Sequence, residues 1–184
     1  MIFAFLNLIV VLLVFFVSLL LLIYYLFAIY SSYKGAPFVP TQKRQIASIL
    51  KEAHLKKGQI FLELGCGEGR VVREAVRRYQ VKGIGTDINP LLLLLARIEA
   101  RMARIKNIRF RKEDVYDTDL SHVDVVFLFL MPKMLEKLSP RLKKAVEEGT
   151  LVISHGFRLT QMAEYCIFIL HDNDFSTFYY RKEN

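Results

Sequence analysis

Three acidic residues stand where three successive predicted strands end. Glu63 closes the first of these strands, Asp87 the second and Asp114 the third. The carboxyl ends of parallel strands meet at one edge of a sheet, where open α/β sheets bind ligands. There, one carboxylate can anchor a ligand amine, a second can accept both hydroxyls of a ribose, and a third can bond the amino group of adenine. The three acids therefore predict a site for one nucleoside that carries an amino acid.

Glycines separate the first acid from the helix that follows it. In "ELGCGEG" (63–69), Gly65, Gly67 and Gly69 recur at every second residue. Such a turn lets backbone N–H groups approach a ligand at a helix N-terminus. Dinucleotide sites typically read G-x-G-x-x-G, with a pyrophosphate on the helix, whereas the pattern here is acid-x-G-x-G-x-G. Because a carboxylate at Glu63 would repel phosphates, the turn favours a ligand with an amino-acid-like tail.

Strands and helices alternate on both sides of this turn. This alternation indicates a mostly parallel, doubly wound α/β sheet. The tail has no room for a helix between its last two strands, so an antiparallel hairpin is expected there. The predicted fold is a Rossmann-like seven-stranded sheet with strands at 59–64, 81–88, 108–115, 123–131, 150–157, 165–172 and 175–183, and helices at about 41–54, 69–79, 90–105 and 133–148.

Four patterns refine these helices. The helix at about 69–79 places on one side the apolar residues Val71, Val72, Ala75 and Val76. Pro140 is expected to break or kink the helix that contains it. The leucines Leu91–Leu95 are too few to span a bilayer and are expected to pack in the core. Arg97, Arg101 and Arg104 recur at helical spacing, which a solvated helix face explains.

The N-terminal residues differ from the rest of the chain. From Ile2 to Ile29 only Asn7 and Ser18 are clearly polar, and every charged side chain lies from Lys34 onward. About 20 apolar residues cross a bilayer core of roughly 30 Å. No basic segment precedes the run, and it exceeds the roughly 7 to 15 apolar residues of a signal peptide, so a membrane anchor is favoured. The expected domains are a transmembrane anchor at 1–30, a juxtamembrane segment at 31–41 and a soluble domain at 42–184.

Charge and cysteine content suggest where the soluble domain resides. Lys34, Lys43 and Arg44 follow the apolar run, so the positive-inside bias predicts a single-pass protein with an external N-terminus and a cytoplasmic domain. Cys66 and Cys166 are too few and too far apart for a disulfide framework or a zinc site. The formal charge of +8 belongs to the soluble part. It is compatible with a nucleic-acid binder, but beside a membrane the bilayer is the simpler partner, and no nucleic acid is predicted.

The acids, the glycine turn and the order of elements resemble those of the class I, or seven-stranded, S-adenosylmethionine-dependent methyltransferases. The match covers the whole soluble domain. The resemblance implies S-adenosyl-L-methionine as the cofactor. It implies that the cofactor-binding residues are Glu63, Gly65, Cys66, Gly67, Gly69, Asp87, Ile88, Asp114, Val115 and Leu130.

Three further stretches narrow the resemblance, namely "GAPFVPT" (35–41), "VVFLFLMP" (125–132) and "VISHGF" (152–157). With the apolar run, they look like the family of membrane-anchored protein-lysine methyltransferases that includes the ATP synthase c-subunit lysine methyltransferase and small prokaryotic relatives. Two positions depart from the family pattern, because Glu63 stands where many members have Asp and Gly156 where the residue is often acidic. The family's P-x-V-P-[ST] segment carries over to Pro37, Phe38, Val39, Pro40 and Thr41, and the proline that ends its fourth strand to Pro132.

This resemblance implies methyl transfer to a protein lysine, and the anchor makes a membrane-protein substrate the expectation. A reacting lysine must be neutral, and an apolar pocket lowers its pKa by desolvation. The candidate substrate pocket is Phe38, Thr41, Met131 and Phe157, and the candidate catalytic residues are Pro132 and His155.

Several of these residues have a second interpretation. His155 is the candidate proton acceptor, but a histidine that only shapes the pocket explains it equally well. Tyr116, Asp117 and Asp119 either steer a cationic substrate or are solvated loop residues. The remaining histidines, His54, His122 and His171, show no ligand spacing, and no metal is predicted.

Three other functions remain open at this point. The acceptor could be a lipid, a quinone or another small amphiphile, or the chain could be a non-catalytic membrane adaptor that binds the cofactor. A nicotinamide oxidoreductase is disfavoured by the glycine spacing and by the lack of a second substrate domain.

Overall fold

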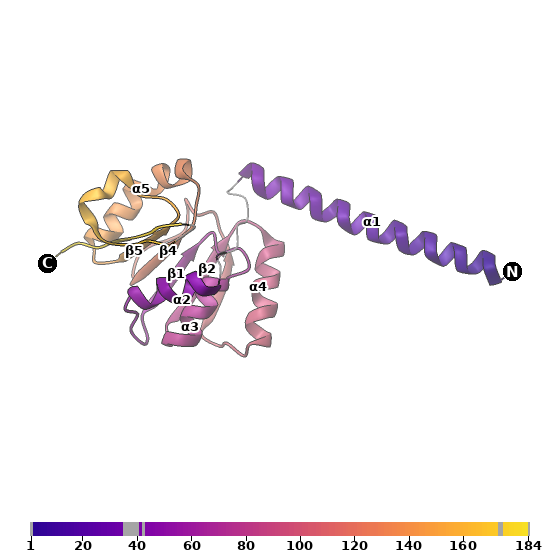
Figure 1. Cartoon of the computed structure of the whole chain (residues 1–184), viewed down its shortest axis with the longest axis horizontal. Helices are drawn as coiled ribbons and strands as arrows, with labels where there is room; N and C mark the ends of the chain where they lie inside the picture. Colours follow the sequence, from indigo (N-terminus) through magenta and orange to yellow (C-terminus); the bar gives the residue numbers. More distant parts are fainter. Residues whose placement is uncertain (1, 35–40, 42, 173–174, 184) are drawn as a thin grey trace. The chain divides into compact units, whose positions relative to one another are not determined.

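The computed structural model describes residues 2–34, 41, 43–172 and 175–183 (Figure 1). The chain divides into two compact units, Met1–Phe38 and Val39–Asn184. The motif residues Pro37, Phe38, Val39 and Pro40 lie outside the described residues, so the predicted juxtamembrane segment stays a prediction.

The first unit contains one long helix, α1 (Ile2–Lys34). Its segment Leu6–Tyr25 is long and apolar enough to cross a membrane, and none of this window is buried in the structure. A signal sequence near an N-terminus meets the same criteria of length and composition. The helix is therefore a candidate span.

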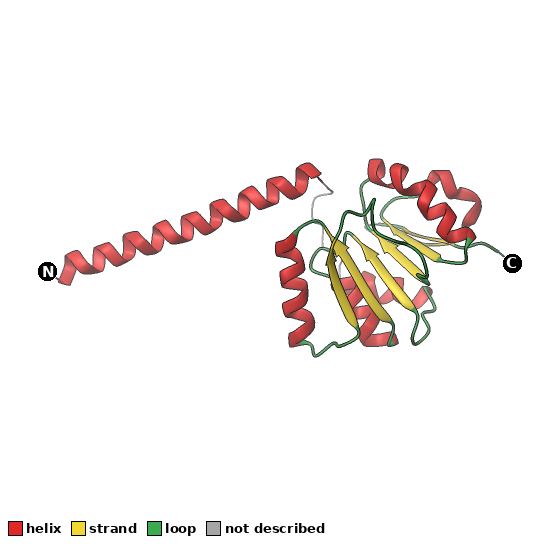
Figure 2. Ribbon diagram, turned by 180° about the vertical axis from the view of Figure 1, so that it is seen from behind, coloured by secondary structure: helices red, strands yellow, loops and turns green. Residues whose placement is uncertain are grey.

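The second unit is built on a seven-stranded sheet, which confirms the predicted fold class (Figure 2). Neighbouring strands from β3 to β5 are parallel, whereas β7 pairs antiparallel with both β5 and β6. The carboxyl ends of the parallel strands thus share one edge. In spatial order the strands are β3 (Ile108–Lys112), β2 (Lys82–Asp87), β1 (Ile60–Leu64), β4 (Val125–Leu128), β5 (Leu151–His155), β7 (Thr177–Tyr180) and β6 (Cys166–Leu170).

Helices bury both faces of this sheet. On one face, α2 (Lys43–Glu52) and α3 (Arg70–Tyr79) pack in one apolar cluster with residues of β1, β4 and β5. On the other face, α5 (Pro132–Glu147) and the 3₁₀ helix η1 (Thr160–Tyr165) complete a second cluster. As predicted, α3 buries Val71, Val72, Ala75 and Val76.

The helix α4 (Pro90–Met102) differs from the prediction. Of the leucines expected in the core, Leu93 is fully buried, but Leu91, Leu94 and Leu95 are exposed. The buried face of α4 instead passes through Leu93, Ala96 and Ala100. Because successive helical residues are rotated by about 100°, the other leucines turn away from that face.

The predicted break at Pro140 does not occur, because α5 continues through Pro140 as one helix. Leu138 and Ser139 before the proline and Leu142 after it are all buried. The Ser139 hydroxyl donates a hydrogen bond to the Leu135 carbonyl at 2.8 Å. Packing on both sides of Pro140 therefore offsets the hydrogen bond that a proline removes.

Candidate functional site

The turn between β1 and α3 requires its glycines. Gly65, Gly67 and Gly69 have φ angles of 68°, 54° and 72°, in the left-handed region that other residues rarely adopt. A Cβ atom added at Gly69 would lie 2.4 Å from the ring of Phe110 on β3. One added at Gly65 would lie 2.8 Å from the Leu130 side chain. Conformation and close packing together fix the backbone of this turn at the N-terminus of α3.

Asp87 fastens the glycine turn to the end of β2. Its two carboxylate oxygens accept hydrogen bonds from the backbone N–H groups of Gly67 and Asn89, both at 2.8 Å. Burial raises the pKa of Asp87, and these hydrogen bonds oppose the rise. Each oxygen retains acceptor capacity. Asp87 can therefore hold the turn and still accept the hydroxyls of a ligand.

Glu63 is buried at the end of β1, beside the first turn of α3. Its Oε2 accepts a hydrogen bond from the backbone N–H of Val72 at 2.8 Å. Desolvation raises the pKa of Glu63 to about 8, although the Val72 hydrogen bond and the charge of Arg73 act to lower it. The negative charge of Asp87 raises it further. A cationic ligand group would offset the cost of ionising this carboxyl, as the proposed ligand amine would.

Asp114 lies just beyond the end of β3 and is exposed. Its side chain accepts a hydrogen bond from the backbone N–H of Tyr116 at 3.0 Å. The N–H of Glu113 donates to the carbonyl of Asp87 at 3.2 Å, which ties the ends of β3 and β2 together. The structure thus places the three predicted acids at the ends of three adjacent strands.

The other predicted cofactor residues surround this edge and differ in exposure. Cys66 and Val115 are buried and Ile88 is half-buried. The buried Leu130 packs beneath Gly65. Desolvation raises the pKa of the Cys66 thiol, so this residue packs as a neutral side chain rather than as a nucleophile.

His155 lies at the end of β5 inside a group of aromatic rings. Its ring centroid is 4.7 Å from that of Phe129 and 5.8 Å from that of Phe175. Its Nδ1 is 2.8 Å from Oγ1 of Thr177, and its buried Nε2 has no hydrogen-bond partner among the described residues. Desolvation lowers the pKa of His155 to about 4, and the charge of Asp172 acts in the opposite direction. The imidazole is therefore neutral near pH 7.

The predicted substrate-pocket and catalytic residues are more dispersed. Met131 and Pro132, at the start of α5, are exposed, and Phe157 is half-buried against the α5 cluster. Thr41 is buried, and its carbonyl accepts a hydrogen bond from Arg70 at 3.4 Å. Phe38 lies outside the described residues.

The loop after β3 contains the residues considered for substrate steering. Asp117 and Asp119 are exposed. The Lys137 ammonium lies 3.9 Å from the ring centroid of Tyr116. Arg141 donates hydrogen bonds to the carbonyls of Tyr116 and Thr118. Basic side chains of α5 therefore already engage this loop.

Within the part of the chain that the structure describes, no group of three or more His, Cys, Asp and Glu side chains is placed to hold a metal ion.

Sequence reasoning missed two features of the site. Asn89 is buried and caps α4 by accepting from the N–H groups of Leu91 and Leu92. Its position before Pro90 is a capping signal that could have revealed it. Phe129 and Phe175 are far apart in the sequence, but the rings of both contact the ring of His155 in the folded domain. Of the two, Phe129 could have been inferred from its place just after a central strand.

Comparisons with known proteins agree with this geometry. The model of the ANTKMT methyltransferase domain family matches residues 63–165. A protein-lysine N-methyltransferase of Saccharolobus islandicus is 32% identical over 130 residues, covering 67% of this chain and 78% of that protein. The ATP synthase c-subunit lysine N-methyltransferase of Homo sapiens is 27% identical over 122 residues, covering 66% of this chain. The match spans about half of the human protein, 52% of its length.

A solved structure matches over nearly its whole length. It is an RNA methyltransferase from Salinibacter ruber in complex with S-adenosyl-L-homocysteine, with a TM-score of 0.74 and 30% sequence identity. The match covers 79% of this chain and 96% of that one.

Proposed function

We propose that this chain, which belongs to the ANTKMT methyltransferase family, is a membrane-anchored enzyme. In this proposal it methylates a lysine of a membrane protein. The enzyme class and the cofactor follow from the family and its relatives: the chain is an S-adenosylmethionine-dependent protein-lysine N-methyltransferase. The anchor, its orientation and the membrane location of the substrate are the proposed part.

The observation that carries the proposed cofactor site is the pair of acids at the glycine turn, the buried Glu63 and the half-buried Asp87. Glu63 would hold the ammonium group of the cofactor, because desolvation raises the pKa of this buried carboxyl and a cation beside it would offset the cost of ionising it. Asp87 would accept the ribose hydroxyls while fastening Gly67. Asp114, at the neighbouring strand end, would bond the adenine amino group. S-adenosylmethionine, when bound, supplies a methyl group on a sulfonium whose leaving group is already activated.

The protein's remaining task is to position a neutral lysine amine. Deprotonating a lysine at pH 7 costs about 4.6 kcal/mol when its pKa is the ordinary value of about 10.4. The aromatic side chains Phe129, just after β4, and Phe175, just before β7, with Met131 and Phe157, would reduce this cost by desolvating the amine. Pro132 would fix the wall of the proposed pocket at the start of α5, and the assignment of Thr41 and Phe38 to this pocket stays a prediction.

His155 fits a positioning role better than that of a base. With a pKa of about 4, its imidazole is a much weaker proton acceptor than the lysine amine it would have to deprotonate. Its contact with Thr177 and its aromatic neighbours hold it in place. We assign it the role of shaping the acceptor pocket.

The anchor would bring this site to its substrate. Residues 1–30 would span the bilayer, 31–41 would connect, and 42–184 would form the catalytic domain on the cytoplasmic side, where Lys34, Lys43 and Arg44 would lie. Confinement to a thin layer raises the effective concentration of the site toward membrane proteins. A relative named for the c subunit of ATP synthase supports a protein acceptor of this kind.

The test is to incubate membranes that contain the full chain with cofactor labelled in its methyl group. We expect the label to remain with protein after lipid extraction and ribonuclease treatment. Label in the lipid extract would support a lipid or quinone acceptor, and label released by ribonuclease would support RNA. Binding of S-adenosylhomocysteine without any transfer would support a non-catalytic adaptor.

A further inference from the structure

The outward face of α4 carries an apolar stripe that the core does not use. We define the α4 stripe as Leu91, Leu94, Leu95, Ile98 and Met102, which are between 36% and 79% exposed. At about 100° per residue, the stripe lies opposite the buried face of Leu93, Ala96 and Ala100. An apolar row of this length on the solvent side of a helix needs a partner.

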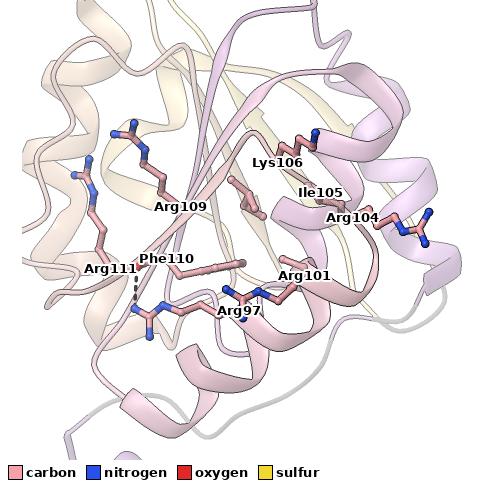
Figure 3. A pocket seen from close by; sticks show the side chains of 10 residues that line it. Arg97, Arg101, Arg104, Ile105, Lys106, Arg109, Phe110 and Arg111 are labelled. Carbon is pink, nitrogen blue, oxygen red and sulfur yellow. Dashed lines mark hydrogen bonds between the residues drawn. The ribbon is translucent and has the colours of Figure 1, made fainter.

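Basic side chains border the stripe on one side. Arg97 and Arg101 follow one flank of α4, and its far end is followed by Arg104 and Lys106. With Arg109 and Phe110 on β3, they line a groove of about 730 Å³ (Figure 3). We call this the basic groove.

Most of these charges lack a protein partner. Among the described residues, Arg101, Arg104, Lys106 and Arg109 take part in none of the ion pairs. Arg97 donates a hydrogen bond to the carbonyl of Phe110 at 2.9 Å, drawn as a dashed line in Figure 3. The groove is therefore available to an anionic partner.

Protection of the sheet edge explains only part of this pattern. β3 is an edge strand, and charged side chains such as Arg109 and Arg111 prevent edge-to-edge pairing. That function does not require an apolar stripe on the neighbouring helix. A helix with an apolar outward face and arginines beside it has instead the composition of an interfacial helix, which lies in the headgroup layer of a membrane.

The stripe and the chain's entry into the domain are both close to the edge that carries the proposed site. The stripe begins at Leu91, whose N–H is bonded by Asn89, next to Asp87. Thr41, where the described part of the domain begins, contacts Arg70 at the start of α3. From Lys34 to Lys43 the chain can extend by no more than about 30 Å. The proposed anchor would therefore keep the domain within reach of lipid headgroups.

We propose that the α4 stripe and the basic groove form a second membrane contact, in which the stripe enters the headgroup layer and the groove binds lipid phosphates. The proposal rests on the anchor of the proposed function and adds an orientation to it. The contact holds the carboxyl edge of the sheet at the membrane surface, where lysines of membrane proteins emerge.

The test uses the full chain in nanodiscs, labelled with an environment-sensitive fluorophore in a Cys166→Ser background. One sample carries the label at Met102→Cys in the stripe. The matched control carries it at Lys144→Cys, an exposed position on α5. We expect doxyl-labelled lipid to quench the Met102 label in nanodiscs that contain phosphatidylglycerol and much less in pure phosphatidylcholine. The Lys144 label should be unquenched in both.

Charge and apolar variants then separate the two parts of the contact. Arg101→Gln with Lys106→Gln should abolish most of the quenching at position 102, whereas Lys56→Gln with Lys57→Gln, an equal change of charge on an exposed loop, should leave it unchanged. Leu94→Gln should reduce it, whereas Ile167→Gln, an apolar side chain of similar exposure on the opposite sheet edge, should not.

Three results would overturn the proposal. The first is equal quenching of the labels at positions 102 and 144. The second is quenching at position 102 that changes neither with lipid charge nor with the Arg101 and Lys106 substitutions. The third is a label at position 102 that is unquenched in nanodiscs that each hold two copies of the chain. The last would identify the stripe as a self-association face. Incorporation into nanodiscs and binding of S-adenosylhomocysteine, measured in the same samples, report separately on the anchor and on the cofactor site.

Discussion

At the residue scale, the buried acid Glu63 stands out because it combines low exposure with a strongly raised pKa. An acid whose pKa is higher in the folded state than in the unfolded state contributes most to stability when it is protonated in both. Its contribution is complete below the ordinary value of 4.5 and is lost as the pH rises to about 8. A bound ammonium group would stabilise the ionised carboxylate of Glu63 and so offset this loss of stability.

Glu63→Gln tests this account. The substitution should remove the part of the stability loss that occurs between pH 4.5 and about 8, a difference on the order of a few kcal/mol. It should also weaken S-adenosylhomocysteine binding and abolish the proton release that accompanies it near pH 7. Thermal unfolding and calorimetry in buffers of different ionisation enthalpy measure both effects. Glu136→Gln, at an exposed position, is the control, and an unchanged pH dependence in Glu63→Gln would refute the assignment.

His155 makes a separate residue-scale prediction. If it positions the pocket, His155→Asn should lower turnover by a similar factor at every pH between about 6 and 9, since it removes packing rather than a titrating base. Steady-state rates across this range provide the measurement. A change in the shape of the profile, with the acidic limb lost in the variant, would instead identify His155 as the proton acceptor.

At the element scale, the glycine turn joins three elements through contacts that only glycine allows. Gly69 caps α3 in a left-handed conformation and lies against Phe110 of β3. Its neighbour Gly67 is held by Asp87 at the end of β2. The geometry of the turn thus depends on β1, β2 and β3 together.

Gly69→Ala should therefore destabilise the domain by about 1 to 3 kcal/mol and weaken cofactor binding, because it adds both strain and a clash. Gly58→Ala is a matched control, since Gly58 has a φ of 85° but open space around its Cβ position. It retains the strain without the clash. Equal losses of stability and of S-adenosylhomocysteine affinity in the two variants would show that packing at Gly69 does not matter.

Much at this scale could be predicted from the sequence, for identifiable reasons. Alternating apolar runs and turn residues predicted the strand order in the chain, the C-terminal hairpin and the buried face of α3. The outward leucines of α4 could not be predicted, because α4 has apolar residues on both of its faces and periodicity then does not show which face meets the core. The uninterrupted helix through Pro140 depends on tertiary packing that no local signal contains. The ring contacts of His155 join residues distant in sequence.

At the scale of the whole molecule, an apolar N-terminal helix precedes a basic catalytic domain. The candidate span Leu6–Tyr25 contains no Asp, Glu, Lys or Arg, while the residues from Lys34 onward, all of which except Lys34 and its neighbours lie in the domain, carry the whole formal charge of +8. Both the positive-inside bias and attraction to anionic lipid favour a position of such a domain against the cytoplasmic leaflet. In the proposed arrangement the substrate would be chosen by location, because lysines near the membrane surface would be within reach of the tethered site.

The most direct test of the central claim is mass spectrometry of whatever the full chain methylates in membranes, compared with the Asp87→Ala variant. We predict methyllysine in a membrane protein, present with the wild-type chain and absent with Asp87→Ala. Methylation of lipid, of RNA or of another type of residue would contradict the account, and so would methyllysine that forms equally well with the variant.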